Sequence, residues 1–182
     1  MSLRALEESD LDLVRRWRNR PEVRGNMYTT HEISEDEHRS WYERVKHDPT
    51  KRYFIFLADD VPLGVIAFTE IHPRNQTASW AFYAGESAPR GTGSRMELAA
   101  LDYAFDVLGL EKLWCEVLAF NTGVLDLHRK FGFQQEGVFR SHHVAGSERV
   151  DVHRLAILRS EWTPEHRAAM ALRITSRERA PT

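Results

Sequence analysis

The sequence predicts a mixed α/β domain with a mainly antiparallel central sheet of about seven strands flanked by helices. Three observations support this class. Apolar segments of strand length are interspersed with segments of helical periodicity. Three consecutive strand-like segments are joined by short turns, which is typical of an antiparallel meander. The 182 residues, of which 42% are hydrophobic and 29% charged, are enough for one domain with a substantial core.

The N-terminal part predicts one strand followed by two helices. The apolar segment 2–6 has the length of a short strand. In "SDLDLVRRWRNR", Ser9 and Asp12 have the spacing of a capping box, and Pro21 ends the helix. The segment 33–48 repeats this spacing of a serine and an acid, so we expect a second helix there.

The period then changes from helical to strand-like. Apolar segments at 53–58, 63–71 and 77–84 are separated by "DDVP" and "HPRNQ", which are rich in turn-forming residues. Short connections between consecutive strands favour antiparallel pairing. We therefore expect a three-stranded meander in the middle of the chain.

The second half predicts two helices and three strands. They cover a helix from 93 to 108, a strand at 112–120, a helix at 121–131 and a hairpin of strands 133–144 and 148–162. The first helix is apolar on two sides, so we expect it to be buried. The strand that follows it is almost continuously apolar, as is typical of a central strand. We expect a single domain over 1–163 and a charged tail over 164–182 that is in part helical.

Composition and charge exclude several functions. A net charge of −2 and a pI near 6.5 argue against a nucleic-acid partner. The single cysteine, Cys115, excludes an intramolecular disulfide, and its apolar setting predicts a small core residue. "MSLRALEESD" does not resemble a secretory signal, and no segment reaches the roughly 18 apolar residues of a membrane span. We expect a cytoplasmic protein with no membrane partner.

A glycine-containing turn, "RGTGSR", lies between the strand at 77–84 and the helix that starts near Gly93. A helix N-terminus binds anions through free N–H groups and its dipole. Glycine lets a ligand approach the backbone and permits positive φ. Most such glycine pairs are only turns, so this stretch alone does not establish a phosphate site.

The pattern Arg90-x-x-Gly93 and the block "CEVLAFNTGVLDLHRKFGF" resemble the GNAT superfamily of acyl-CoA-dependent N-acetyltransferases. The resemblance implies acetyl-CoA as co-substrate and direct acetyl transfer to an amine, without a metal. It implies CoA contacts from the turn, the preceding strand and the following helix: Phe82, Tyr83, Arg90, Gly91, Thr92, Gly93, Ser94, Arg95, Met96, Asn121, His128 and Lys130. Arg95 stands where the family usually has Gly or Ala, and it is either a backbone donor or a contact to a CoA phosphate.

The resemblance also implies that the strand ending in "WAFYA" pairs with the pantetheine amides. A bulge in that strand would aim the N–H of Phe82 or Tyr83 at the thioester oxygen, as a small oxyanion hole. Asn121 either contacts the pantetheine or is a plain helix cap. These two roles are compatible with each other.

Glu116 is the predicted general base. It precedes Asn121 by five residues in an apolar strand, a spacing that resembles the catalytic glutamate of N-terminal acetyltransferases. Partial burial would make it a better base. The alternative is a structural carboxylate paired with Lys112 or Lys130. Glu70 is the second candidate for the base.

His128 is the predicted general acid. The family usually places a tyrosine seven residues after the asparagine, and this chain has a histidine there. An unperturbed imidazole is only about one quarter protonated at pH 7. His128 therefore needs a carboxylate such as Glu116 to raise its pKa. The alternative is that His128 only packs near CoA while Tyr83, Tyr103 or water supplies the proton.

The resemblance narrows to the pseudaminic-acid-pathway N-acetyltransferases through "WRNRPEVRGNM", "ISEDEHRSW" and "LHRKFGFQQEGVFRSH". It implies that the acceptor is the 4-amino group of a UDP-linked 4-amino-4,6-dideoxy sugar. Rim-type protein N-terminal acetyltransferases share much of the pattern, so a peptide N-terminus is the alternative. A non-catalytic CoA-binding domain is a third reading, which the departures at Arg95 and His128 keep open.

The acceptor contacts are predicted from the cationic, amide and aromatic side chains near the cleft. They are Arg18, Asn19, Met27, His38, Trp80 and His142. The polar residues of the last hairpin, His142, His143, Asp151 and His153, are interpreted as polar contacts and not as metal ligands. Both a monomer and a homodimer are compatible with the sequence.

Overall fold

The computed structural model describes residues 1–178 and confirms the predicted class. One seven-stranded sheet has the order β1-β2-β3-β4-β5-β7-β6, and only β4 and β5 are parallel neighbours. The strands are β1 (Ser2–Ala5), β2 (Arg52–Ala58), β3 (Val61–His72), β4 (Thr77–Ala84), β5 (Lys112–Leu118), β6 (Gln134–Ala145) and β7 (Glu148–Leu158). The helices are α1 (Leu11–Asn19), α2 (Pro21–Arg24), α3 (Glu35–Val45), α4 (Thr92–Asp102), α5 (Thr122–Lys130) and α6 (Pro164–Glu178).

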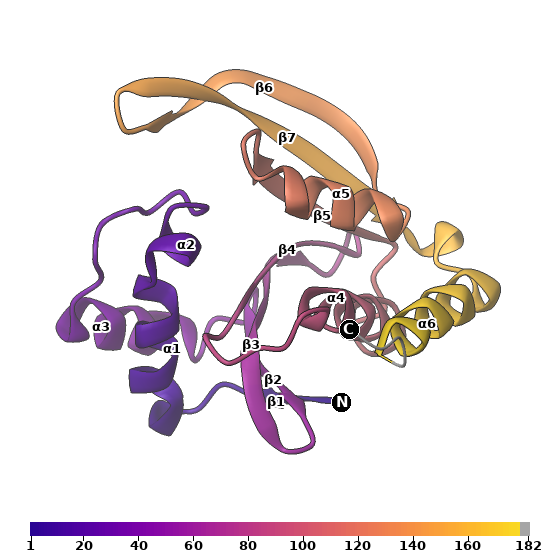
Figure 1. Cartoon of the computed structure of the whole chain (residues 1–182), viewed down its shortest axis with the longest axis horizontal. Coiled ribbons are helices and arrows are strands. Elements are labelled where there is room, and N and C mark those ends of the chain that lie inside the picture. The colour runs from indigo at the N-terminus through magenta and orange to yellow at the C-terminus, as the bar shows by residue number, and fades with distance from the viewer. Residues whose placement is uncertain (179–182) are drawn as a thin grey trace.

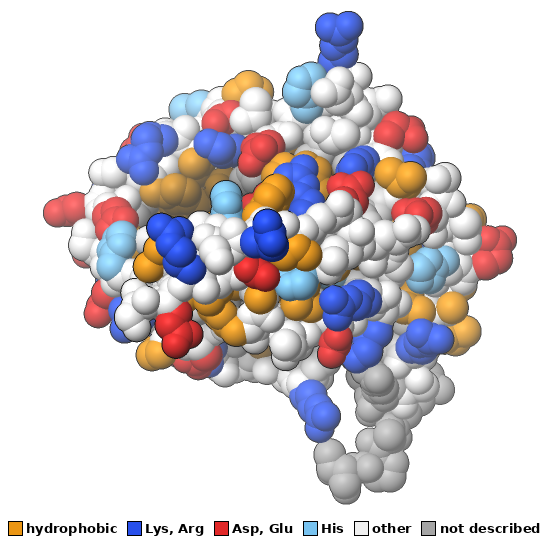
Figure 2. Space-filling view, turned by 90° about the horizontal axis from the view of Figure 1, so that it is seen from above, with side chains coloured by type: hydrophobic (Ala, Val, Ile, Leu, Met, Phe, Trp, Pro, Cys, Tyr) orange, Lys and Arg blue, Asp and Glu red, His pale blue; other side chains and the backbone are white. Residues whose placement is uncertain are grey.

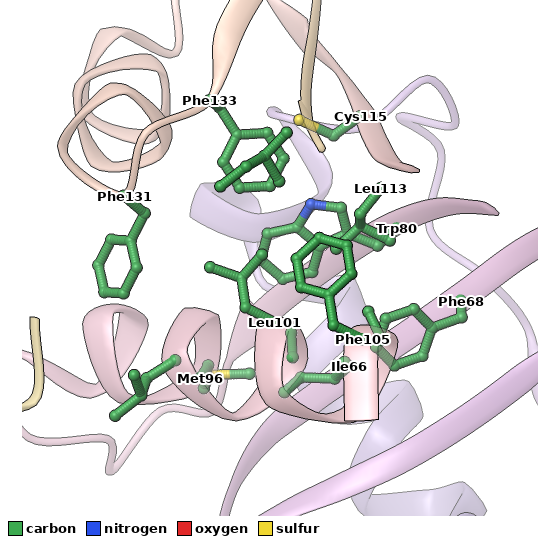
Figure 3. Close-up of a cluster of buried hydrophobic side chains, with 14 of the residues drawn as sticks. Ile66, Phe68, Trp80, Met96, Leu101, Phe105, Leu113, Cys115, Phe131 and Phe133 are labelled. Atoms are coloured by element: carbon green, nitrogen blue, oxygen red, sulfur yellow. The ribbon is translucent and has the colours of Figure 1, made fainter. Parts of the chain in front are cut away.

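Helices cover both faces of the sheet (Figure 1), with α1 to α3 on one side and α4 to α6 on the other. Side chains alternate between the faces along each strand. In β2, Phe54 and Phe56 enter the core beneath α4, whereas Ile55 between them packs with Val14 and Trp17 of α1. The larger core lies on the α4 side, and Trp80 is at its centre (Figure 3).

The N-terminal helix does not begin as the sequence suggested. The Ser9–Asp12 capping box is wrong, because Asp10 carries out the capping instead. Its carboxylate accepts the backbone N–H of Glu7 at 2.9 Å and pairs with Arg4 at 2.7 Å. A short 3-10 turn therefore precedes α1. The second helix does start at Ser34, whose hydroxyl accepts the backbone N–H of Glu37 at 3.2 Å, while the Glu37 carboxylate contacts His31.

The long central helix changes its winding near its end. After Asp102 the chain forms a π-helical turn over Tyr103–Val107, in which the Leu108 N–H donates to the Tyr103 carbonyl at 3.0 Å. Gly109 follows with φ of 63° and ends the helix, as predicted. The helix thus covers the sheet and returns the chain to β5.

The C-terminal segment is a fifteen-residue helix that packs on α4, beside it in Figure 1. Met170 is buried in the main core, with Ile174 partly buried beside it. Arg167 pairs with Asp102 of α4 at 2.7 Å. The core therefore extends beyond residue 163. The end of the predicted tail, 179–182, lies outside the described residues.

Candidate active site

A cleft forms where β4 and β5 separate. The two strands pair only over Thr77–Ser79 and Lys112–Trp114. Beyond that point β4 stays paired with β3, and β5 stays paired with β7. A cavity of about 450 Å³ opens between them, and Trp80 to Ala84 of β4 and Cys115 to Val117 of β5 line its walls.

The predicted bulge in the β4 segment is wrong. The register between β3 and β4 runs without a shift from Ser79 to Ala84. The irregularity lies at the other end of the pair, in β3 between Thr69 and His72. The backbone edge of β4 is exposed to the cavity because its neighbour diverges, and no extra residue is needed to turn it outward.

The glycine turn is placed at the end of this cavity, at the N-terminus of α4. Gly91, Thr92 and Gly93 line the cavity. Gly91 has φ of 93°, which only glycine adopts without strain. A Cβ at Gly93 would lie 3.3 Å from the Leu127 side chain, so glycine lets α4 approach α5 closely. Within residues 1–178, no backbone acceptor takes the N–H of Gly91 or Gly93.

The groups after Gly93 in this turn bond or pack within the protein. The Ser94 and Arg95 N–H groups donate to the Gly91 carbonyl at 3.1 and 3.3 Å. The Arg95 guanidinium bonds the Thr92 hydroxyl at 3.2 Å, and Met96 is fully buried in the core. Arg90 lies exposed on the turn beside the cavity. The turn thus has fewer free backbone N–H groups than the predicted span from Gly91 to Met96 would offer.

Helix α5 places two of the predicted residues in the cavity. Asn121 precedes the helix and lines the cavity, and its side chain makes no capping bond. Its amide is therefore not used by the helix. His128 lines the cavity two turns later. Lys130, at the end of α5, is exposed and does not line the cavity.

His128 forms a buried pair with a residue that the sequence analysis missed. Its Nδ1 lies 2.8 Å from Oε1 of Glu97 on α4, and the two side chains are 3% and 0% exposed. Burial alone would lower the pKa of His128, but Glu97 and the neighbouring Cys115 raise it to about 10. The carboxylate that supports His128 is therefore Glu97, and not Glu116 as expected.

Glu116 lies on β5 at the opposite wall and is held by two groups. Its Oε2 accepts the Tyr28 hydroxyl at 2.7 Å, and its Oε1 accepts Arg154 at 3.2 Å. The expected alternatives, Lys112 and Lys130, are not its partners. Lys112 pairs with Glu136 instead. The carboxylate lines the cavity with 24% of its side chain exposed, so it can reach a bound amine.

The same architecture is found in known acetyltransferases. Residues 1–134 match the family described as acetyltransferase (GNAT) domain. The chain belongs to the GNAT acetyltransferase family. It is accordingly an acetyl-CoA-dependent N-acetyltransferase, with acetyl-CoA as its co-substrate. The opening between β4 and β5, with the glycine turn at its end, is the candidate active site of this enzyme.

Similar proteins include spermidine acetyltransferases and the acetyltransferase PseH. The spermidine N(1)-acetyltransferase of Vibrio cholerae is 27% identical over 89% of this chain and 95% of its own length. The acetyltransferase PseH of Campylobacter jejuni is 27% identical over 70% of this chain and 79% of its own. A crystal structure of the V. cholerae enzyme in complex with CoA and spermine has a TM-score of 0.82 and 27% identity, and the match covers 88% of this chain and 96% of that one.

Most predicted acceptor residues of this GNAT domain lie outside the cavity. The Arg18 guanidinium donates to the Thr29 carbonyl at 2.9 Å, and Asn19 holds Ile33 through two bonds. His38 is buried and stacks on Trp41 at 5.0 Å. These side chains fix the loop between α2 and α3. They were predicted as acceptor contacts because polar character alone does not reveal an internal partner.

The other predicted acceptor contacts, and the second candidate base, lie partly in the cavity, partly in the core and partly on the surface. Met27 and Trp80 line the cavity, although Trp80 is 2% exposed and belongs mainly to the core. His142 is exposed on the hairpin, next to Phe139. Glu70, the second candidate base, lies on β3 beyond the paired end of β4 and β5, and it does not line the cavity.

The tyrosines that were alternatives to His128 occupy different positions. Tyr83 lines the cavity, and burial raises the pKa of its hydroxyl well above the ordinary value. Tyr103 packs between Phe54 and Phe68, at ring distances of 4.7 and 5.5 Å. Tyr83 and His128 are thus the predicted proton donors whose residues line the cavity, but the Tyr83 side chain packs with the core on the α1 side.

The face of the molecule in Figure 2 carries charges of both signs. Figure 2 shows acidic and basic side chains intermixed on the face seen from above, around a recess with a hydrophobic floor. Within residues 1–178, no group of three or more His, Cys, Asp or Glu side chains is arranged to hold a metal ion. None of the described helices combines the length and the apolar character needed to cross a membrane.

Proposed function

We propose that this enzyme acetylates a primary amine of a small cationic molecule of the polyamine class. The observation that carries the proposal is the charge of the cavity lining. Three carboxylates, those of Glu22, Glu86 and Glu116, line it against two cations, Arg20 and His128. Arg20 pairs with Glu22 and Glu116 with Arg154, while His128 is balanced by Glu97 behind it, so Glu86 leaves the lining with an excess of negative charge. A second ammonium group of the acceptor would be attracted by these carboxylates, and a diphosphate would be repelled by them.

The residues then divide the reaction between the two walls. On one wall, Glu116 accepts a proton from the amine, directly or through a water, as the nitrogen attacks the thioester carbonyl. On the other wall, His128 gives a proton to the sulfur as the carbon–sulfur bond breaks. Acetyl-CoA supplies the acyl group, and the Gly91 and Gly93 N–H groups are placed to bind its pyrophosphate. The edge of β4 offers backbone groups to the pantetheine.

A UDP-linked 4-amino-4,6-dideoxy sugar is the second candidate acceptor. Its support is the match to PseH and the position of Arg154, which pairs with Glu116 and stacks on Trp114 at 3.4 Å. A planar guanidinium at this point can bind a diphosphate in a bidentate manner. Of the residues predicted as acceptor contacts, Arg18 does not line the cavity and donates to the Thr29 carbonyl, and the indole N–H of Trp80 is buried.

The test is a thiol-release assay with acetyl-CoA and three acceptor sets. They are spermidine and spermine, UDP-linked 4-amino sugars, and peptides with free N-termini. We expect turnover on the polyamines, with kcat/KM at least tenfold above the other sets. Turnover on the UDP sugars alone would overturn the polyamine proposal, and turnover only on peptides would move the enzyme to the Rim-type class.

Two variants test the assigned roles in the same assay. Glu116→Gln should lower kcat by about 10² to 10⁴-fold, the usual contribution of a general base. Glu70→Gln is the matched control and should leave kcat unchanged. His128→Phe should lower kcat while the KM for acetyl-CoA stays within a few fold. Near-full kcat in His128→Phe would assign the acid role to Tyr83 or to water.

A further inference from the structure

A carboxylate in the core of the molecule is the unusual feature of this site. Glu97 lies on α4 between Met96 and Leu98, and its side chain is 0% exposed. Its Oε1 contacts His128, while its Oε2 has no hydrogen-bond partner within the described residues. Burying a charged group this deeply costs several kcal/mol unless it is paired. The pair with His128 is the compensation that the structure provides.

The other groups around the imidazole are uncharged or weakly polar. Trp80 and Phe82 of β4 face its ring at 5.3 and 6.1 Å, and Phe133 after α5 faces it at 5.0 Å. From β5, Cys115 contacts His128 and also lines the cavity. Glu97 is therefore the carboxylate that faces His128 among residues 1–178.

The aromatic walls leave His128 little freedom to rotate. With Nδ1 fixed by Glu97, the ring orientation is set, and Nε2 is the nitrogen left for a substrate. A carboxylate that accepts the Nδ1–H bond fixes the tautomer of the ring and, through its charge, favours protonation at Nε2. The tyrosine usual at this position in the family needs no such partner, because its hydroxyl carries a proton at neutral pH.

We propose that Glu97 is a positioning residue for acetyl transfer. It holds His128 as an imidazolium, with the Nε2–H available to the sulfur of CoA. In the step in which CoA leaves, the bond between the acetyl carbon and the sulfur breaks, and the sulfur takes the Nε2 proton. The proton lost by the amine passes through Glu116 to solvent, and solvent returns one to His128. This inference rests on the proposed function, in which His128 is the acid.

The first test needs neither acceptor nor variant. The ¹⁵N shifts of the His128 ring, followed by NMR from pH 6 to pH 10 in the full chain, report its protonation directly. We expect an imidazolium at pH 8 and titration near pH 10. A neutral ring at pH 8 would overturn the proposal, whatever amine the enzyme uses.

The second test separates charge from shape with Glu97→Gln. The amide can still accept the Nδ1–H bond, but it lacks the charge, so the pKa of His128 should fall to 6.5 or below. At pH 8 only about 3% of the ring would then carry the proton, and kcat should fall about 30-fold. The alkaline limb of the kcat profile should move from near pH 10 to below pH 7, while the KM for acetyl-CoA stays within twofold.

Two further variants control for folding and for helix charge. Asp102→Asn removes a carboxylate from the same helix, together with its pair with Arg167, and should leave the kcat profile unchanged. Glu97→Asp keeps the charge and should restore the alkaline limb in part. An unmoved alkaline limb in a folded Glu97→Gln protein would reject the positioning role. Failure of every acceptor, with an imidazolium still present at pH 8, would reject only the proposed function.

Discussion

At the scale of single residues, Tyr28 occupies the oxygen of Glu116 that an incoming amine would use. Its hydroxyl donates to Oε2 at 2.7 Å, and its ring packs edge-on against His143 of the hairpin at 5.2 Å. Burial and the contact with Glu116 raise the pKa of the Tyr28 hydroxyl, so it stays a donor across the working pH range. The tyrosine therefore bridges the α2–α3 loop and the β5 wall.

Replacing this hydroxyl should favour the acceptor. In Tyr28→Phe the amine no longer has to displace a hydrogen bond worth about 1 kcal/mol, so its KM should fall about fivefold. The KM for acetyl-CoA should not change. Steady-state kinetics with the preferred amine measures both values, and Tyr42→Phe is the control outside the cavity. A rise in the KM for the amine would instead show that Tyr28 contacts the acceptor.

His128 and Glu97 show what the sequence can predict at this scale. His128 was predicted from the resemblance to the GNAT family, which usually has a tyrosine seven residues after the asparagine. Glu97 is 31 positions away, and its contact depends on how α4 packs against α5. The available signal was an acid within the apolar stretch "MELAAL" of a helix predicted to be buried. A charged residue at such a position requires a partner.

At the scale of elements, helix α4 and the π-helical turn that continues it lie between two glycines with positive φ. Gly91 has φ of 93° and Gly109 has φ of 63°, and a Cβ at either position would meet no atom within 4 Å. An alanine at either site is therefore strained only through its backbone, by about 1–2 kcal/mol. The two ends differ in that Gly91 lines the cavity and Gly109 does not.

This pair gives a matched test of the anion site. Gly91→Ala and Gly109→Ala should each lower the free energy of unfolding by about 1–2 kcal/mol, as measured by urea denaturation. Only Gly91→Ala should also weaken acetyl-CoA binding, by about tenfold in calorimetry, because the turn moves the N–H groups of Gly91 and Gly93. Equal acetyl-CoA affinity in both variants would contradict the assignment of this turn to the pyrophosphate.

The strand pairing shows the limit of prediction for elements. Periodicity placed β4 and β5 at nearly their observed positions, because alternation is a local property of the chain. It did not predict that they pair over three residues and then diverge, because that depends on the α5 connection and the pairing of β5 with β7. The bulge in β4 was predicted in order to turn backbone groups toward the pantetheine. The structure exposes that backbone edge without a bulge, because β5 diverges from β4.

At the scale of the whole molecule, the two faces of the sheet carry different parts of the core and of the candidate site. The α1 side packs Val14 and Trp17 against Ile55 and Val65, and it carries the loop that places Tyr28. The opposite side holds the larger core, the Glu97–His128 pair and helix α6. The cavity lies where these faces meet, between β4 and β5. Changes in the part of the larger core that does not line the cavity should therefore affect stability without changing the acceptor.

Helix α6 allows a test of this separation between stability and activity. Its charged sequence predicted a tail, but Met170 is part of the larger core. Met170 is 5% exposed against α4, whereas Leu172, two residues on, is 71% exposed. Met170→Ala should lower the free energy of unfolding by about 2–4 kcal/mol through lost burial and a cavity. Leu172→Ala should change it by less than about 0.5 kcal/mol. Chemical denaturation measures both, with kcat at 25 °C unchanged in each variant. Equal stability losses would mean that α6 does not dock on α4 in solution, and that the domain ends near residue 163.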